Sequence, residues 1–274
     1  MLIQNNESFK NLSNKLKGLG LTNYNFINQT ENDIWYFLRN TCVVQHDGIN
    51  CVPLHLNLLN LEALFLLENG ADVYLTSPRV SFGTTTICAY ILWKALNENF
   101  TFSLVSPSRL NNEYMFIRMR NIIKLPIHER KNLMGFVDID NVIKYEIDVD
   151  LIFIDDFENF KNSDVNKIFK LLKLKKEGKI KSQIVFKSCL GRQHSLGRRV
   201  GDDIAKTAHK FEYYLFDNPQ LIQSNELYYV QEKFENIFDD SDNLLERIKK
   251  DLNFDDEILN NDFLCNRCKN YEIR

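Results

Sequence analysis

Cysteine, proline and glycine are all sparse in this sequence of 274 residues, which contains six Cys, five Pro and ten Gly. Six cysteines scattered over so long a chain are too few for the disulfide framework of a small secreted protein. The low proline and glycine contents exclude collagen-like and low-complexity chains. With 44% hydrophobic and 26% charged residues, the composition is that of a globular protein with a sizeable core.

Long apolar runs are also absent. The longest apolar stretch, Leu58 to Leu67, is interrupted by Asn60 and Glu62, and it is well short of the roughly 18 residues that a membrane span needs. The first twenty residues are polar and lack the apolar region and the cleavage site of an export signal. We therefore expect an intracellular protein with reduced thiols and no membrane association.

The spacing of apolar residues predicts helices that alternate with short strands. Helices are predicted at 54–70, 85–96, 111–123 and 164–174, and strands at 71–77, 100–106, 133–139, 148–154, 182–188 and 211–216. Strands separated by helical segments of about 10 to 15 residues indicate βαβ units. Such units form a mainly parallel sheet with helices on both faces. The predicted fold class is therefore α/β.

The chain divides into three predicted parts. Residues 1–50 are expected to form a helical N-terminal segment, with Leu12, Leu16 and Leu19 marking a short helix and 34–38 suggesting another. Residues 51–223 are expected to form the α/β core. Residues 224–274 are expected to form an acidic, helical C-terminal extension.

Positive charge is concentrated in one stretch, although the net charge of the chain is −3. Residues 161–210 contain 14 Lys or Arg against four Asp or Glu, whereas residues 211–274 contain seven against 15. A local excess of positive charge is expected on a surface that binds a polyanion such as DNA. The alternative is that the lysines between 167 and 176 form the solvated face of an amphipathic helix. The residues that we assign to a DNA-binding surface are Lys173, Lys175, Lys176, Arg192, Arg198 and Arg199.

The segment TSPRVSFGTTT, residues 76–86, lies between a predicted strand and a predicted helix. A phosphate-binding loop in that position surrounds the phosphates with backbone N–H groups and a helix N-terminus, and it offers a hydroxyl to Mg²⁺. Gly83, Thr84 and Thr85 occupy the places of G-K-[ST], with Thr85 as the candidate metal ligand, but the lysine is missing. The alternative is an ordinary strand-to-helix turn capped by threonine. Candidate nucleotide contacts in the loop are Ser81, Gly83, Thr84, Thr85 and Thr86.

The segment LIFIDDFE, residues 151–158, predicts a buried strand that ends in carboxylates. Ligands of open α/β sheets bind at the carboxyl ends of the strands. Asp155 is the candidate to hold Mg²⁺ through water. Asp156, with Glu158 as the second choice, is the candidate to polarise the attacking water. Because strands often end in acidic residues, a purely structural interpretation also stands.

The segment SQIVFKSCLGRQHSLGRR, residues 182–199, predicts a strand followed by a glycine-rich basic loop. Ser188 at the strand end is a candidate sensor of the γ-phosphate. Arg192, Arg198 and Arg199 are candidates to contact phosphates of ATP or of DNA. The alternative is a plain exposed basic turn.

In their order along the chain, these motifs resemble the ATPase domain of viral large terminases, the P-loop motors that drive DNA into capsids. SPRVSFGTTT resembles the family's variable Walker A motif, LIFIDDFENF its Walker B motif with an acidic pair, and IVFKSCLG its coupling motif. Asn60 stands where the family has an adenine-motif Gln, and Arg79 resembles the loop Arg that stabilises the γ-phosphate. The resemblance extends over roughly residues 51–265, and Asn260 to Asn266 resembles the stretch that closes the ATPase part.

The resemblance implies a nucleotide-binding site for ATP and Mg²⁺, hydrolysis of ATP and translocation of double-stranded DNA. The partners that it implies are a capsid portal, a small terminase subunit, a separate nuclease and further copies of the chain in a homo-oligomeric ring. The expected location is the host cell cytoplasm, with transient attachment to the procapsid. Thr84 replaces the family's lysine and Asp156 its Walker B Glu, which places hydrolysis in question, because stabilisation of phosphate charge dominates phosphoryl transfer.

Three functions follow as expectations. The first is an ATPase subunit of a DNA-packaging motor, and the second is a non-hydrolysing relative that binds DNA or the portal. The third is a helicase-like ATPase, which should require motifs in a second RecA-like domain. The family's nuclease domain has no counterpart here, so we expect it to be encoded separately, or the chain to be a truncated or degenerate copy.

Overall fold

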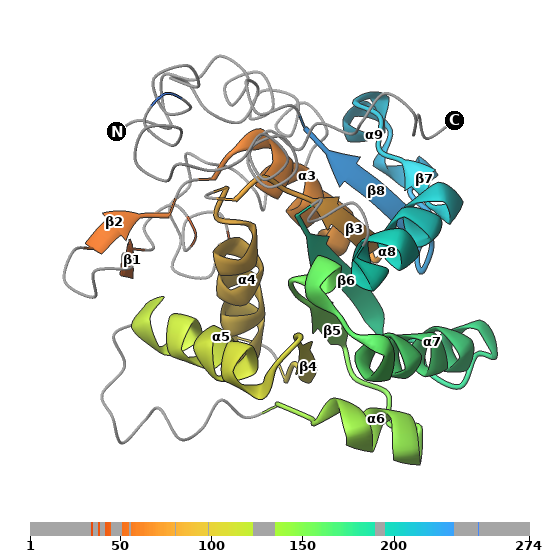
Figure 1. The fold of residues 1–274 in the computed structure, drawn as a ribbon. Helices are drawn as coiled ribbons and strands as arrows, with labels where there is room; N and C mark the ends of the chain where they lie inside the picture. The colour runs from red at the N-terminus through yellow and green to blue at the C-terminus, as the bar shows by residue number, and fades with distance from the viewer. Residues whose placement is uncertain are drawn as a thin grey trace.

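The computed structural model describes residues 34, 38, 42–44, 51–54, 56–79, 81–97, 99–122, 135–189, 195–232 and 246 (Figure 1). Its centre is a six-stranded sheet in the order β4-β5-β6-β3-β8-β7, in which every pair of neighbours is parallel. This arrangement confirms the predicted α/β class. The strands are β3 Asp72–Thr76, β4 Phe102–Val105, β5 Leu151–Ile154, β6 Gln183–Ser188, β7 His209–Lys210 and β8 Leu227–Gln231.

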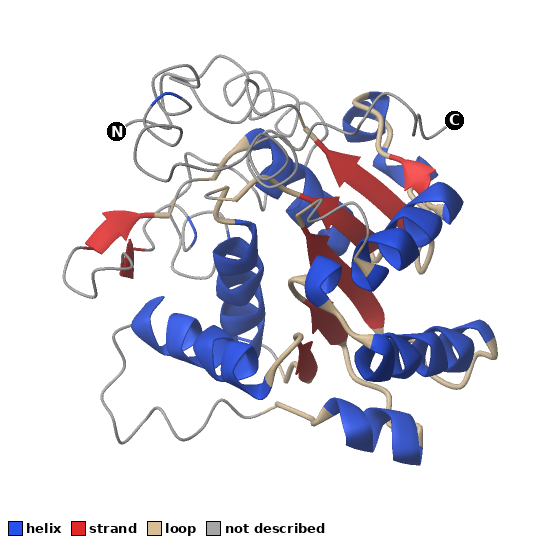
Figure 2. Ribbon diagram, in the orientation of Figure 1, coloured by secondary structure: helices blue, strands red, loops and turns tan. Residues whose placement is uncertain are grey.

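Helices cover both faces of this sheet (Figure 2). Because successive side chains of a strand point to opposite faces, Val73 and Leu75 of β3 belong to the core under α3, α4 and α5. Tyr74, between them, belongs to the core under α6, α7 and α8. The helices are α3 Leu58–Glu68, α4 Gly83–Asn97, α5 Arg109–Ile122, α6 Ile139–Tyr145, α7 Asn162–Lys176, α8 Leu196–Thr207 and α9 Tyr214–Asp217. No helix in the described part of the chain is long and apolar enough to span a membrane.

Two predicted strands are wrong. In 133–139, of which 135–139 are described, Phe136 forms a single bridge to Phe102, and Asp138 then caps helix α6 through its side chain. In 211–216, the aromatic run is not a strand, since α9 covers its last three residues. Here Leu215 and Phe216 are both buried. A strand would point two consecutive residues to opposite faces, so core packing overrides the β propensity of the aromatic residues.

Part of the predicted basic loop is helix α8. Ser195 caps this helix by accepting a hydrogen bond from the Arg198 N–H at 3.2 Å. Gly197 and Gly201, which suggest a loop in the sequence, lie one helical turn apart on its packed face. A Cβ atom at Gly197 would lie 2.0 Å from the Phe157 carbonyl oxygen, and one at Gly201 would lie 2.2 Å from the Tyr74 hydroxyl. These glycines therefore allow the helix to approach the sheet closely.

The predicted boundaries of the core also change. The core continues past residue 223, because β8 pairs with β3 along its whole length. At the other boundary, β1 Cys42–Val44 pairs antiparallel with β2 Cys51–Pro53. Ile34 and Leu38 are helical and are buried in the main core, whereas the predicted helix at 12–19 and nearly all of the acidic extension lie outside the described residues.

Candidate functional site

The three predicted motifs meet at the carboxyl ends of β3, β5 and β6. These strands are neighbours in the sheet, with β6 between β5 and β3. The register pairs Thr76 with Ser188, and the Ser77 N–H donates to the Ser188 carbonyl at 2.9 Å. Asp155 directly follows β5. The loop, the aspartate pair and Ser188 are therefore brought together at the edge of the sheet where ligands of this fold class bind.

The loop after β3 is held by two side chains at the start of α3. The side-chain amides of Asn57 and Asn60 both donate to the Ser81 carbonyl at 2.8 Å. Asn60 is fully buried, so its amide braces the loop, and this geometry does not support the expected contact with an adenine base. Ser81 is buried as well. The next residue, Phe82, has φ of 60°, a strained conformation for a residue with a side chain.

The hydroxyls at the start of α4 are distributed differently from the sequence prediction. The Thr84 hydroxyl donates to Asp155 Oδ1 at 3.0 Å. The Thr85 hydroxyl instead accepts a hydrogen bond from Arg118 Nη1 of α5 at 2.9 Å. Thr86 is fully buried, and its hydroxyl has no partner among the described residues. The hydroxyl that faces the Asp155 carboxylate is therefore that of Thr84, which corrects the register in which we placed Thr85.

The aspartate pair consists of one buried and one partly exposed carboxylate. Asp155 is buried, and this burial raises its pKa, while the Lys187 ammonium lowers it. The Asp156 side chain is 33% exposed. Its φ of 51° is a conformation that is rare without a specific reason in residues other than glycine. The strained residue Asp156 therefore carries the more accessible of the two carboxylates at the end of β5.

Lys187 completes the cluster, and our sequence analysis did not identify it. Its side chain is 9% exposed, and its Nζ lies 3.7 Å from Asp155 Oδ1 and 3.5 Å from Asp156 Oδ1. Burial lowers the pKa of Lys187, but the surrounding Cys189, Asp155, Asp156 and Glu158 outweigh this effect and raise it. The available signal was a lysine inside an otherwise apolar strand, since buried lysines are rare unless they are paired.

Glu158 connects the end of β5 to the end of β6. It lies in the short 3-10 helix η4 Phe157–Asn159 and is buried. Its Oε2 accepts hydrogen bonds from the Ser188 hydroxyl at 2.9 Å and from the Cys189 N–H at 3.2 Å. Burial raises the pKa of Glu158 to about 7. Glu158 is thus placed to hold Ser188, whereas Asp156 is the more accessible carboxylate.

The predicted basic residues divide between surface and interior. Lys175 forms a 2.8 Å ion pair with Asp72 at the opposite end of the sheet, and buried Arg198 lies 3.8 Å from Asp202. Both are corrections, because neither side chain is exposed to a DNA backbone. The exposed predicted cations are Arg79 in the loop, Lys173 and Lys176 on α7 and Arg199 on α8, while Arg192 lies outside the described residues.

The oxygen atoms at the strand ends fit a magnesium ion that is bound together with a nucleotide. Mg²⁺ is usually held by one or two carboxylates, with phosphate oxygens and water supplying the other ligands. Asp155 Oδ1 and Thr84 Oγ1 lie 3.0 Å apart and provide suitable donors. Among the described residues, no group of three or more His, Cys, Asp and Glu could hold a metal ion. Asp155 and Thr84 are therefore the described residues that could hold such an ion.

Comparison with known proteins gives only distant likenesses. No protein-family model matches the sequence, and no curated protein matches it. A solved structure of a mutant large terminase ATPase domain from Thermus phage P74-26 is 8% identical, with a TM-score of 0.48 over 81% of this chain and 98% of that chain. Another structure of that ATPase domain is 9% identical, with a TM-score of 0.44 over 70% of this chain and 85% of the other. Neither likeness identifies a function for this chain.

Proposed function

We propose that this chain is an ATPase subunit of a viral DNA-packaging motor, with ATP and Mg²⁺ bound between the 76–86 loop and the end of β5. The observation that carries the proposal is the 3.0 Å hydrogen bond from Thr84 to Asp155. This bond joins the start of α4, the helix after β3, to the carboxylate of Asp155, the residue after β5. In the sheet, β5 lies two positions away from β3. The order of the sequence motifs, which resembles that of large terminases, supports the choice of motor.

Each residue of the strand ends then has a distinct role. The N-terminus of α4 presents N–H groups and a partial positive charge to the phosphates. When bound, Mg²⁺ would neutralise phosphate charge and polarise the γ-phosphate. Asp155 and Thr84 would orient the metal, and Asp156 would accept a hydrogen bond from the attacking water and fix its direction. Arg79, which is exposed on the loop, would stabilise charge on the γ-phosphate.

Ser188 and Glu158 would couple the site to the rest of the subunit. Ser188 is the last residue of β6, and it contacts the loop through its carbonyl and η4 through its hydroxyl. A change in the loop on loss of the γ-phosphate would therefore act on η4 and on α8, which packs against it. Double-stranded DNA would contact Lys173, Lys176 and Arg199. The capsid portal, a small subunit, a separate nuclease and a homo-oligomeric ring complete the proposed assembly.

The proposal is tested by measuring ATP binding and phosphate release by the purified chain, with and without double-stranded DNA. Thr84→Val and Asp155→Asn should each weaken Mg²⁺-dependent ATP binding by about tenfold or more, since each removes a charged or polar ligand contact. Thr85→Val is the matched control, because that hydroxyl is bonded to Arg118 instead. Equal ATP affinity in the wild type, Thr84→Val and Asp155→Asn would refute the site.

A second candidate function is a non-hydrolysing module that binds DNA or the portal. The absence of a lysine from the loop favours this function. In a phosphate-binding loop the lysine stands directly before the hydroxyl residue, and here Gly83 stands directly before Thr84. Phosphate release at the background rate, together with retained DNA binding, would support the module. DNA-stimulated phosphate release would exclude it.

A further inference from the structure

The loop lacks the lysine that phosphate-binding loops place against the β- and γ-phosphates, and its one cation, Arg79, already has a proposed role at the γ-phosphate. With Thr84 as the hydroxyl that faces Asp155, the preceding position belongs to Gly83, which carries no side chain. A triphosphate at this edge would also face the carboxylates of Asp155 and Asp156. A second positive charge, from outside the loop, would offset this repulsion and help a triphosphate to bind tightly.

Lys187 lies where such a charge is required. It is the penultimate residue of β6, the strand between the loop strand β3 and the aspartate strand β5. The ladder pairs it with Leu75, and its successor Ser188 with Thr76, from which the loop departs. Asp155 Oδ1 lies 3.0 Å from the Thr84 hydroxyl and 3.7 Å from Lys187 Nζ. The ammonium and the metal-facing hydroxyl therefore share one carboxylate oxygen.

The contacts of this ammonium are long. Charge-assisted N–H···O bonds are typically about 2.7 to 2.9 Å, yet the Lys187 ammonium lies 3.5 Å from Asp156 Oδ1 and 3.7 Å from Asp155 Oδ1. By contrast, the partly buried Lys175 lies 2.8 Å from Asp72 and 2.6 Å from the Ser182 carbonyl. A lysine that is buried among carboxylates but not closely bonded to them retains hydrogen-bonding capacity for another anion.

We infer that Lys187 supplies, from the neighbouring strand, the phosphate-binding ammonium group that the loop, which has Arg79 but no lysine, does not carry. This inference rests on the proposed ATP site and identifies the residue that makes it work without a loop lysine. The long, flexible stem of lysine allows Nζ to leave the aspartates for a phosphate oxygen. The same aspartates then become free to hold Mg²⁺ through Asp155 and the attacking water through Asp156.

The opposite role is also testable. A buried ammonium beside Asp155 would compete with Mg²⁺ for the same oxygen if it did not move. In that case, removal of the ammonium would strengthen Mg²⁺-dependent ATP binding. The two roles therefore predict effects of opposite sign for one substitution.

The experiment compares the affinities of ATP, ADP and AMP for the full chain by calorimetry in Mg²⁺ buffer. If Lys187 contacts the β- or γ-phosphate, Lys187→Met should weaken ATP binding by about tenfold or more and change AMP binding far less. Lys175→Met is the matched control, since it also removes a lysine that is paired with an aspartate, but at the other end of the sheet. It should leave all three affinities unchanged at a temperature where the variant is folded.

A rescue variant separates loss of the cation from damage to the fold. Gly83 is the first residue of α4, and a Cβ there would lie 3.2 Å from the Ser77 hydroxyl oxygen and 3.6 Å from Leu75 Cδ2. A shift of the Ser77 side chain by a few tenths of an ångström would accommodate this Cβ atom. The double variant Gly83→Lys, Lys187→Met restores a lysine directly before the metal-facing threonine, and it should recover most of the lost ATP affinity.

The outcomes separate this inference from the proposed function. Selective loss of ATP affinity in Lys187→Met, with recovery in the double variant, supports the inference. Unchanged or tighter ATP binding in a folded Lys187→Met overturns it and leaves the ATP site standing. Parallel loss of ATP and AMP binding without rescue overturns it as well, because it indicates a structural role. Absence of ATP binding by the wild type refutes the proposed function itself.

Discussion

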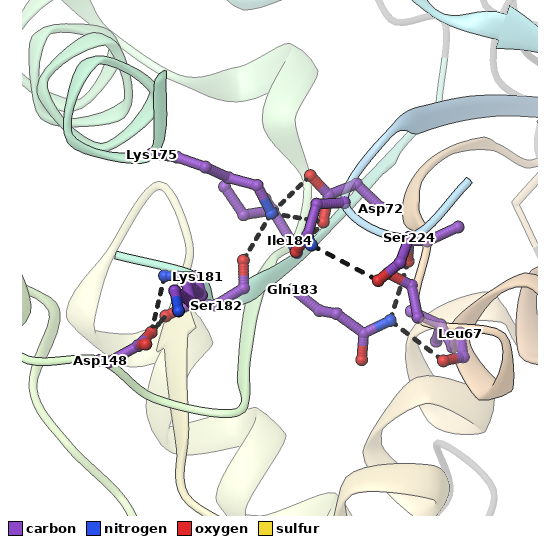
Figure 3. Close-up of polar contacts among 12 residues, drawn as sticks. Leu67, Asp72, Asp148, Lys175, Lys181, Ser182, Gln183, Ile184 and Ser224 are labelled. Atoms are coloured by element: carbon purple, nitrogen blue, oxygen red, sulfur yellow. Dashed lines mark hydrogen bonds and ion pairs between the residues drawn. The ribbon is translucent and has the colours of Figure 1, made fainter. Parts of the chain in front are cut away.

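Each end of the central sheet contains a lysine beside an aspartate, but the two pairs are built differently. At the amino end, Lys175 Nζ lies 2.8 Å from both carboxylate oxygens of Asp72 and 2.6 Å from the Ser182 carbonyl (Figure 3). Asp72 also accepts the Ile184 N–H at 2.8 Å. At the carboxyl end, the ammonium of Lys187 lies at least 3.5 Å from its aspartates. The lysine at the amino end therefore forms close hydrogen bonds within the protein, whereas the lysine at the carboxyl end retains hydrogen-bonding capacity.

The neighbouring contacts at the amino end follow the same pattern. The Gln183 amide donates to the carbonyls of Leu67 and Ala71 at 3.0 and 2.9 Å, and Asp148 accepts from the Lys181 N–H and the Ser182 hydroxyl at 2.9 Å each (Figure 3). Backbone conformation does not separate the two ends, because Phe82 and Asp156 at the carboxyl end have positive φ and so do Glu146 and Asn225, which precede β5 and β8. The two ends differ in how closely their polar groups are bonded.

The largest effect that would test this comparison is on stability at the amino end. Lys175→Met leaves the Asp72 carboxylate buried without its cation, so the free energy of unfolding should fall by about 3 to 5 kcal/mol. Urea denaturation followed by circular dichroism measures this change. A loss below about 1 kcal/mol would contradict the assignment of this pair as a structural one.

The opposite pattern is expected at the carboxyl end for Asp156→Gly. Glycine adopts positive φ without strain, so the free energy of unfolding should stay the same or rise by about 1 kcal/mol. Phosphate release should fall by about a hundredfold or more, because the group that positions the water is lost. Asp203→Gly, a change of an exposed aspartate on α8, controls for loss of an acidic side chain. Retained phosphate release would remove Asp156 from the mechanism.

A smaller effect concerns the pH dependence of stability and arises from Glu158. Its pKa is about 7 in the folded chain and 4.5 in its ordinary state, so the folded state binds the proton more tightly than the unfolded state. The stability that this group contributes is therefore greatest at and below pH 4.5, falls as the pH rises from 4.5 to about 7, and levels off at higher pH. Glu158→Gln should remove this part of the decline. When the free energy of unfolding is measured at pH 5, 6, 7 and 8, that of the variant should rise relative to that of the wild type. If the free energies of the two proteins change in parallel with pH, the raised pKa of Glu158 is contradicted.

The smallest effect should come from α7, the helix that also carries Lys175. Lys173 and Lys176 are exposed on it, and each phosphate contact contributes about 0.9 to the slope of log affinity for DNA against log salt. Lys173→Gln and Lys176→Gln should each reduce that slope by about 1 and weaken binding equally for all sequences. Lys144→Gln, on exposed Lys144 of α6, serves as the control. A slope that is unchanged in both variants would move the DNA surface away from α7.

The sequence allowed the parallel sheet to be predicted because its strands have distinctive patterns. The central strands β3, β5 and β6 each contain a short apolar run, and each was predicted with its ends within three residues of those observed. Strand β8 was missed because polar residues of an acidic segment flank it, and only its pairing with β3 reveals it. Helix α8 was missed because glycine normally signals a loop, whereas here Gly197 and Gly201 permit close packing.

The sequence predicted that the three motifs would meet, but it did not predict which threonine of α4 faces Asp155. The convergence of the loop, Asp155 and Ser188 follows from strand order, which the motif order allowed us to anticipate. The choice between Thr84 and Thr85 depends on the rotation of α4 about its axis, which the sequence does not specify. Lys187 was not predicted because phosphate-binding motifs place their lysine in the loop after β3. Lys187 instead lies on the adjacent strand β6.

The close fit of α8 against η4 has a mechanical consequence. At Gly197 the backbone of the helix touches the backbone of η4 with no side chain between them, and side-chain rotation is the usual means by which packed elements absorb small shifts. A displacement of Glu158 would therefore push directly on the backbone of the helix. Arg199, exposed on the same helix, would then travel with every change at the strand ends.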